Sequence, residues 1–240
     1  MTGLAVFDLD GTLVDSPAAI VAAVTAAFGA MGVPAPAAAD IRATIGLPLP
    51  KAFGDLLGVP ADDARTVLGV EQYQVAYRQL VLPRAATLVF PGVADGLAAL
   101  RAEGFTLAVA TSKFHASADA LLTAAGLRDH FALVVGADEV TRPKPDPETG
   151  LLIARELGVP AGRAVMVGDT THDLLMAAGA GMRSIAVTYG VHSLPELRSA
   201  DPTWLADSFD DVVACLRAAA TDQTGAGVAS PVRGWGDPRP

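Results

Sequence analysis

The chain has 240 residues, of which 51% are hydrophobic and 18% are charged, and its formal net charge is −9 at pH 7. This length allows one large domain, or one domain that carries a smaller insert. The acidic balance disfavours binding to nucleic acid or to anionic membrane surfaces. No apolar run reaches the ~18 residues of a membrane span, and the N-terminus lacks a signal-peptide pattern, so we expect a cytoplasmic protein. The single cysteine, Cys215, cannot form a disulfide within the chain.

Short apolar runs recur along the chain, and most of them lead into a longer helical pattern. The runs are apolar throughout, as in strands that are covered on both faces. This alternation predicts an α/β fold with a parallel sheet and helices on both sides. The predicted strands are Leu4–Phe7, Thr106–Ala110, Leu133–Val135, Ala164–Val167 and Ser184–Val187.

One segment, residues 16–86, shows helical patterns and no strand pattern. Ser16 and Pro17 suit the N-cap and the first position of a helix that Gly32 ends. Further helices are predicted at 40–43, 51–57, 61–68 and 71–82, with Gly58 as the C-terminal cap of the one at 51–57. The sequence therefore predicts a helical domain at 16–86 inserted into an α/β core of residues 1–15 and 87–220. Residues 221–240 lack periodicity and predict a disordered tail.

Polar and charged residues follow four of the predicted strands. They are Asp8 and Asp10 after the first strand, Thr111 and Ser112 after the second, Lys144 after the third, and Asp169 and Asp173 after the fourth. Ligands of an open parallel sheet bind beyond the carboxyl ends of its strands. We therefore expect these side chains to form one site.

The residue types in this set indicate a site for phosphate and a metal ion. Asp8 and Asp10 are separated by one residue, so their side chains leave an extended chain on the same side. Several carboxylates in one crevice repel each other unless a cation compensates them, and oxygen ligands suit Mg²⁺. Lys144 adds a positive charge that can hold a phosphate oxygen, and Thr111 adds a hydroxyl beside the start of a helix.

The segments DLDGTLVDS, TSK, RPKP and GDTTHD resemble, in order and spacing, the motifs of the haloacid dehalogenase superfamily. The residues of these segments are similar to those in the branch of the superfamily that includes phosphoglycolate phosphatases, and the resemblance extends from Leu4 to about Leu216. It implies a modified Rossmann core with a mobile helical cap inserted after the first motif. It also implies a Mg²⁺-dependent phosphatase that acts on a small phosphorylated metabolite.

The resemblance also implies a role for each motif residue. Asp8 resembles the nucleophile that forms an aspartyl-phosphate, and Asp10 resembles the general acid that later activates water. The residues that resemble the Mg²⁺ ligands are Asp8, Asp10 through its backbone carbonyl, and Asp169, with Asp173 in support. Those that resemble the phosphoryl-binding residues are Thr111, Ser112 and Lys144. Dehalogenases of the superfamily lack an acid at the Asp10 position, so a carbon–halogen substrate is disfavoured.

Several alternatives stay open at the level of sequence. A sugar phosphomutase of the same fold, a pyrophosphatase, and a binding protein without turnover share these features. The substrate is equally open among phosphoglycolate, pyrophosphate, a sugar phosphate and a nucleotide monophosphate, and so is the choice between monomer and homodimer. Arg42 and Lys51 are candidates to hold an acidic substrate, with a solvated helix face as the alternative. Tyr73, Tyr77 and Arg78 share one predicted helix, where packing is the more common role of the tyrosines.

Overall fold

The computed structural model describes residues 3–223 and contains a six-stranded parallel sheet in the order β3-β2-β1-β4-β5-β6. The strands are β1 Gly3–Phe7, β2 Phe105–Ala110, β3 Leu133–Val135, β4 Ala164–Gly168, β5 Arg183–Val187 and β6 Trp204–Ala206. Each predicted strand is present, and its ends agree to within one residue. The sequence analysis did not predict β6, which is a run of only three apolar residues on an edge strand, with Trp204 half-buried and Leu205 exposed.

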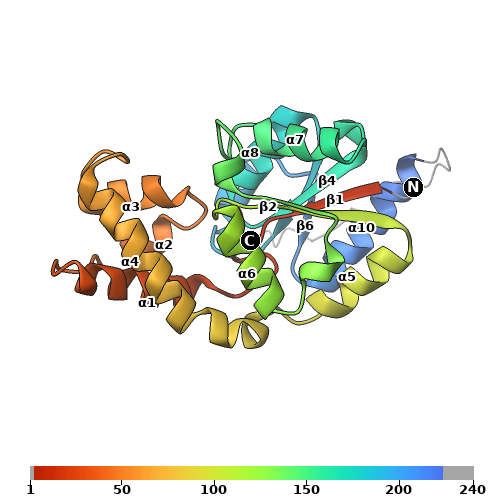
Figure 1. The fold of residues 1–240 in the computed structure, drawn as a ribbon. Helices are drawn as coiled ribbons and strands as arrows, with labels where there is room; N and C mark the ends of the chain where they lie inside the picture. Colours follow the sequence, from red (N-terminus) through yellow and green to blue (C-terminus); the bar gives the residue numbers. More distant parts are fainter. Residues whose placement is uncertain (1–2, 224–240) are drawn as a thin grey trace, which may run out of the picture.

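Helices cover both faces of the sheet, as the continuous apolar runs predict (Figure 1). On one face lie α5 (Val93–Ala102), α6 (His115–Ala124) and α10 (Phe209–Gln223), and on the other lie α7 (Glu148–Glu156) and α8 (Thr171–Ala180). Phe7 of β1 stacks on Phe209 with ring centroids 6.0 Å apart, whereas its neighbour Val6 packs with Met176 on the opposite face. Successive side chains of β1 therefore enter two separate cores, and the predicted α/β fold with a parallel sheet is confirmed.

Shorter elements complete the part of the chain that the structure describes. They are the helix α9 (Leu194–Ser199) and four 3₁₀ helices, η1 (Leu82–Leu88), η2 (Arg128–His130), η3 (Ala137–Glu139) and η4 (Ala161–Arg163). Helix α10 continues to Gln223, past the predicted boundary at residue 220, and residues 224–240 of the predicted tail lie outside the described residues. Among the described helices, none combines the length and the apolar character needed to cross a bilayer.

The helices of residues 16–86 form a separate cluster beside the sheet, on the left of Figure 1. They are α1 (Pro17–Ala30), α2 (Ala38–Ala43), α3 (Leu49–Leu57) and α4 (Ala64–Leu80). Aromatic rings join three of these helices, since Phe53 stacks on Phe28 at 5.8 Å and meets Tyr73 edge-on at 5.9 Å. These rings form the interior of the cluster, and they belong to the same continuous hydrophobic core as Phe7 of β1.

Two chain segments, 13–15 and 88–90, connect this cluster to the sheet and lie side by side. The backbone N–H of Asp15 donates to Leu88 O at 2.7 Å, and the N–H of Phe90 donates to Leu13 O at 3.1 Å. Val14 and Val89 form an antiparallel bridge between the same segments. The chain therefore leaves and re-enters the sheet region at one place.

The structure corrects two details of the helical prediction. The predicted helices at 61–68 and 71–82 are one helix, α4, which begins after Asp63. Gly69, inside α4, allows α3 and α4 to pack closely, because a Cβ at this position would lie 2.5 Å from the Phe53 ring. Ser16 precedes α1 but makes no side-chain cap, because its hydroxyl donates to Asp10 Oδ1 at 2.5 Å. Gly58 caps α3 in a left-handed conformation, as predicted.

Candidate active site

The strand order places the predicted site residues at a topological switch point. The chain passes from β1 to β2 and β3 on one side, and then crosses to β4 on the other side of β1. Phe7 pairs with Val167, and the N–H of Asp8 donates to Val167 O at 2.9 Å. Asp8 and Asp169 therefore emerge side by side at the carboxyl ends of adjacent strands, where open α/β sheets bind ligands.

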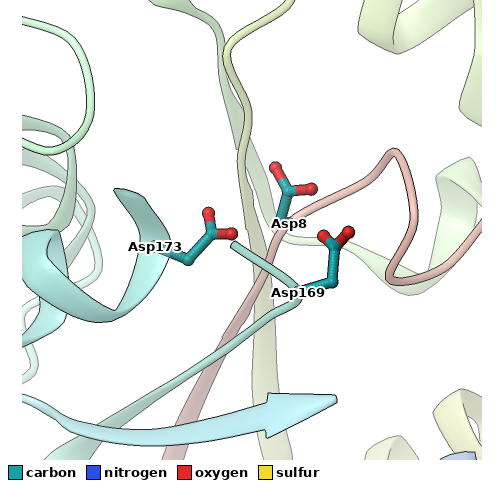
Figure 2. A group of neighbouring side chains, drawn as sticks. All are labelled: Asp8, Asp169 and Asp173. Carbon is teal, nitrogen blue, oxygen red and sulfur yellow. The ribbon is translucent and has the colours of Figure 1, made fainter. Parts of the chain in front are cut away.

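Asp8, Asp169 and Asp173 form a buried acidic group (Figure 2). One carboxylate oxygen from each lies within 4.8 Å of the others. Burial, together with repulsion from Asp173, raises the pKa of Asp8 to about 7, although Lys144 opposes this shift. Burial and the charges of Asp8 and Asp173 raise the pKa of Asp169 well above its ordinary value. A divalent cation fits this oxygen donor set, because it would relieve the repulsion that raises both pKa values.

Lys144 places a single positive charge inside the acidic group. Its Nζ lies 2.7 Å from Asp8 Oδ1 and 2.5 Å from Asp173 Oδ1, and it donates to Ala110 O at 2.9 Å. Burial alone would lower the pKa of this lysine, but the two carboxylates raise it above its ordinary value. Lys144 therefore stays charged beside Asp8, in the place where the sequence predicted a phosphate-binding lysine.

Asp169 is held in one orientation by its neighbours. Its Oδ1 accepts from the Thr12 hydroxyl at 3.0 Å, and its Oδ2 accepts from the Val191 N–H at 2.8 Å. Gly11 and Gly190 approach so closely that a Cβ at either position would lie 2.2 Å from an Asp169 atom. The sequence pattern indicated no role for Thr12 or these glycines, because their contact with Asp169 arises only from the fold: Thr12 is 157 residues away from Asp169 along the chain, and Val191 is 22 residues away.

Asp173 is oriented by the start of its own helix. The Thr170 N–H and hydroxyl donate to Asp173 Oδ2 at 3.1 and 2.7 Å, as in a capping box. This leaves Asp173 Oδ1 for Lys144. A Cβ at Gly168 would lie 2.4 Å from Asp173 Cβ, so the end of β4 also needs a glycine to admit this side chain.

The Asp10 carboxylate lies outside the acidic group and has partners of its own. Oδ1 accepts from the Ser16 hydroxyl at 2.5 Å, and Oδ2 lies 3.1 Å from Lys113 Nζ. Lys113 also sits over the Tyr77 ring, 4.3 Å from its centroid. Asp10 and Lys113 thereby contact the helical cluster, and the sequence analysis assigned no role to Lys113 although it belongs to the TSK segment.

Thr111 and Ser112 follow β2 and are both buried. The Thr111 hydroxyl accepts from the Lys113 N–H at 3.2 Å, while the Ser112 hydroxyl donates to Gly46 O at 2.7 Å. Gly46 lies in the loop between α2 and α3. Ser112 thus joins the edge of the sheet directly to the helical cluster.

A cavity of about 320 Å³ lies between the strand ends and the helical cluster, lined by both. Asp8, Asp10, Thr111 and Ser112 are among its lining residues. The structure does not bring Arg42 or Lys51 to this cavity. Arg42 is exposed on α2, and Lys51 is exposed on α3, where it pairs with Asp55 at 2.7 Å.

The helical cluster contributes a different cation to the cavity, Arg78 of α4. Arg42 and Lys51 flank the segment between α2 and α3, but a position near a turn does not fix the direction of a side chain. Arg78 lies one residue after Tyr77 on the helix that packs against α1 and α3.

Comparison with known proteins gives the family. Residues 5–187 match the model of the haloacid dehalogenase-like hydrolases. The chain belongs to this hydrolase family. It is 54% identical over 218 residues to the probable phosphatase IndB of Dickeya dadantii, covering 91% of this chain and 95% of that protein. These findings confirm the predicted resemblance and the predicted enzyme class, a phosphatase of this family.

More distant relatives share the fold over a similar length. The hydrolase is 32% identical over 232 residues to the phosphoglycolate phosphatase of Salmonella paratyphi A, covering 88% of this chain and 90% of that protein. The crystal structure of β-phosphoglucomutase from Clostridium difficile superposes with a TM-score of 0.80 at 18% identity, covering 94% of this chain and all of that one (100%). The second likeness shows the fold alone.

The buried position of Lys144 leads to a stability prediction with a matched control. Lys144→Met should lower the free energy of unfolding by about 3 kcal/mol in the presence of a chelator, because it leaves Asp8 and Asp173 buried without a counter-charge. Lys51→Met removes the same charge from an exposed pair and should cost at most about 1 kcal/mol. Urea denaturation near neutral pH measures both, and equal losses would show that Lys144 does not stabilise the acidic group.

Proposed function

We propose that this hydrolase is a cytoplasmic, Mg²⁺-dependent phosphatase that transfers the phosphoryl group of a small phosphomonoester to Asp8 and then to water. The observation that supports this most strongly is the buried Asp8 carboxylate, 2.7 Å from Lys144 and within 4.8 Å of the Asp169 and Asp173 oxygens at the edge of a cavity. A nucleophile, a cation for phosphate and a metal-binding group therefore meet at one point.

In the first step, a carboxylate oxygen of Asp8 forms a bond to phosphorus while the bond from phosphorus to the ester oxygen breaks. Asp10 gives its proton to the departing oxygen, which leaves as an alcohol. Lys144 compensates charge beside Asp8, and Thr111 and Ser112 offer hydroxyls to the phosphoryl oxygens. The Ser112 hydroxyl now donates to Gly46 O, so substrate would compete for this bond.

In the second step, Asp10 takes a proton from a water molecule, whose oxygen forms a bond to phosphorus. The bond between phosphorus and Asp8 breaks, and the Asp8 carboxylate is restored together with inorganic phosphate. The Ser16 and Lys113 contacts of Asp10 hold its carboxylate in a fixed orientation for both proton transfers. One residue can serve as acid and then as base because the two steps use opposite protonation states.

Asp8, Asp169, Asp173 and the backbone carbonyl of Asp10 are the residues that would hold Mg²⁺. When bound, Mg²⁺ supplies charge compensation for the phosphoryl oxygens and for the crowded carboxylates. The donor set supports Mg²⁺ over softer metals because it consists of oxygen atoms alone.

Residues 16–86 act in this proposal as a cap domain over the core of residues 1–15 and 87–220. The paired segments at Leu13–Asp15 and Leu88–Phe90 form the hinge, since they are the two connections between the parts. Opening would break the Ser112–Gly46 bond and admit substrate, and closure would exclude bulk water. The likeness to a phosphoglycolate phosphatase and to a phosphatase over nearly the whole chain favours hydrolysis over transfer to a second sugar hydroxyl.

The raised pKa of Asp8 leads to a prediction for Mg²⁺ binding. Below pH 7 Asp8 holds a proton that the metal must displace, because its pKa is about 7, whereas above pH 7 this competition disappears. The affinity for Mg²⁺ should therefore fall by at least roughly tenfold per pH unit below 7, and a proton held by Asp169, whose pKa is also raised, would make the fall steeper. Calorimetric titrations in buffers of different ionisation enthalpy measure both the affinity and the released protons. An affinity independent of pH, without proton release, would contradict the assignment.

The nucleophile assignment is tested by phosphate release from a panel of phosphomonoesters, with Mg²⁺ and with a chelator. The native chain should release phosphate only with Mg²⁺, and Asp8→Asn should lower the rate by roughly a thousandfold or more. Asp55→Asn removes an exposed carboxylate on α3 and should leave the rate unchanged. Product analysis on sugar phosphates distinguishes free phosphate from an isomeric sugar phosphate. Activity retained in Asp8→Asn, or the isomer as the product, would refute the proposal.

A further inference from the structure

The cavity beside Asp8 has two chemically different parts. Most of its polar lining lies at the strand ends and includes Asp8, Asp10, Thr111, Ser112 and Lys113. The side chains from α1, α3 and the loop before α3 are mainly aliphatic or aromatic, among them Ile45, Leu49 and Phe53. Its volume of about 320 Å³ lies near the lower limit of the ~300–1,000 Å³ usual for small-molecule sites. The cavity therefore suits a phosphate group that carries one small apolar group.

The cations near this cavity are mostly engaged by protein carboxylates. Lys113 lines the cavity, but its Nζ lies 3.1 Å from Asp10. Lys144 bonds to Asp8 and Asp173. Within residues 3–223, Arg78 is the one lining cation without an acidic partner, and it lies on an exposed part of α4.

This charge distribution bears on substrates that have a carboxylate close to the phosphate. In phosphoglycolate a single methylene separates the carboxylate from the phosphate ester oxygen. With its phosphate at Asp8, such a carboxylate would stay one methylene away from the ester oxygen, beside Asp10 and the Lys113 that Asp10 pairs with, or against the apolar walls. Among the lining cations within residues 3–223, only the exposed Arg78 is free to pair with it. A carboxylate moved from water to an apolar surface without a partner loses a large hydration free energy. The cavity thus disfavours the substrate named for the Salmonella relative.

Uncharged polar groups complete the walls. Gln74 and Tyr77 of α4 line the cavity, and the buried Tyr77 hydroxyl has no hydrogen-bond partner among the described residues. An amide and a phenol can bond to an uncharged donor or acceptor on a ligand without requiring a charge. The walls therefore offer apolar contact and neutral hydrogen bonding together.

From these observations, and resting on the phosphatase function proposed above, we propose that the substrate is the phosphate ester of an uncharged, largely apolar alcohol about one ring in size. The phosphate binds at Asp8, and the organic group lies against Ile45, Leu49 and Phe53. Discrimination against a charged group arises from the helical cluster, because the polar residues at the strand ends contact only the phosphate and the metal.

The first test compares substrates that share a primary alkoxide leaving group, so that the chemical step is comparable. In isobutyl phosphate, two methyl groups stand where phosphoglycolate has carboxylate oxygens. The kcat/KM for isobutyl phosphate should exceed that for phosphoglycolate by at least about tenfold. Along ethyl, propyl and butyl phosphate, kcat/KM should rise about fourfold per methylene, as expected for burial of each group. The kcat/KM for benzyl phosphate should likewise exceed that for phosphoglycolate, which tests whether the cavity accepts a ring.

The second test changes the wall. Leu49→Lys places a cation at the half-buried start of α3, so it should lower kcat/KM for benzyl phosphate about tenfold and raise it for phosphoglycolate. Leu151→Lys introduces the same group at an exposed position of α7, away from the cavity, and should change neither value. The substrate series on the native chain remains decisive if Leu49→Lys fails to fold.

The outcomes separate this inference from the proposed function. If phosphoglycolate is hydrolysed faster than isobutyl phosphate, the inference is overturned while the phosphatase function stands. If neither these esters nor any phosphomonoester of the wider panel releases phosphate with Mg²⁺, the proposed function fails and the inference fails with it. If the native chain prefers the alkyl esters and Leu49→Lys reduces this preference, the result supports both the inference and the proposed function.

Discussion

The arrangement of the active site depends on one buried ammonium group, that of Lys144. Three buried carboxylates within 4.8 Å of one another would otherwise take up protons or prevent folding. Lys144 bonds to Asp8 and Asp173 at once, which compensates part of their charge and holds one oxygen of each carboxylate in place. When all three carboxylates are ionised they outnumber the single charge of Lys144, so the site would attract a divalent cation.

The sheet and the helical cluster meet at the same few residues. Parallel strands bring Asp8 and Asp169 together at the switch point, and the residues that follow β2 reach across to the helices. Ser112 bonds to Gly46, and Lys113 lies between Asp10 and Tyr77. Any movement of the helices relative to the sheet must break or remake these contacts. Since the helices also line the cavity proposed for the organic group of the substrate, binding of that group and the position of Asp10 would be linked.

Much of the polar part of the site could be predicted from sequence, because Asp8, Thr111 and Asp169 directly follow apolar runs, and the carboxyl ends of parallel strands lie at one edge of the sheet. The helical cluster was predicted only in outline. Gly69 inside α4 allows close packing on Phe53, and the cavity walls depend on how the helices of the cluster pack; local sequence patterns encode neither feature. For the same reason Arg42 and Lys51 were chosen from their place beside a turn, whereas the helix packing brings Arg78 to the cavity.

The central claim is that Asp8 carries the phosphoryl group during turnover. Rapid mixing of the Mg²⁺-loaded enzyme with excess substrate, quenching in acid and mass spectrometry of the peptides test it most directly. The account predicts a transient phosphoryl group on Asp8, formed before phosphate reaches its steady rate of release and absent in Asp8→Asn. Steady phosphate release from the native enzyme with Asp8 unmodified at every time point would contradict it.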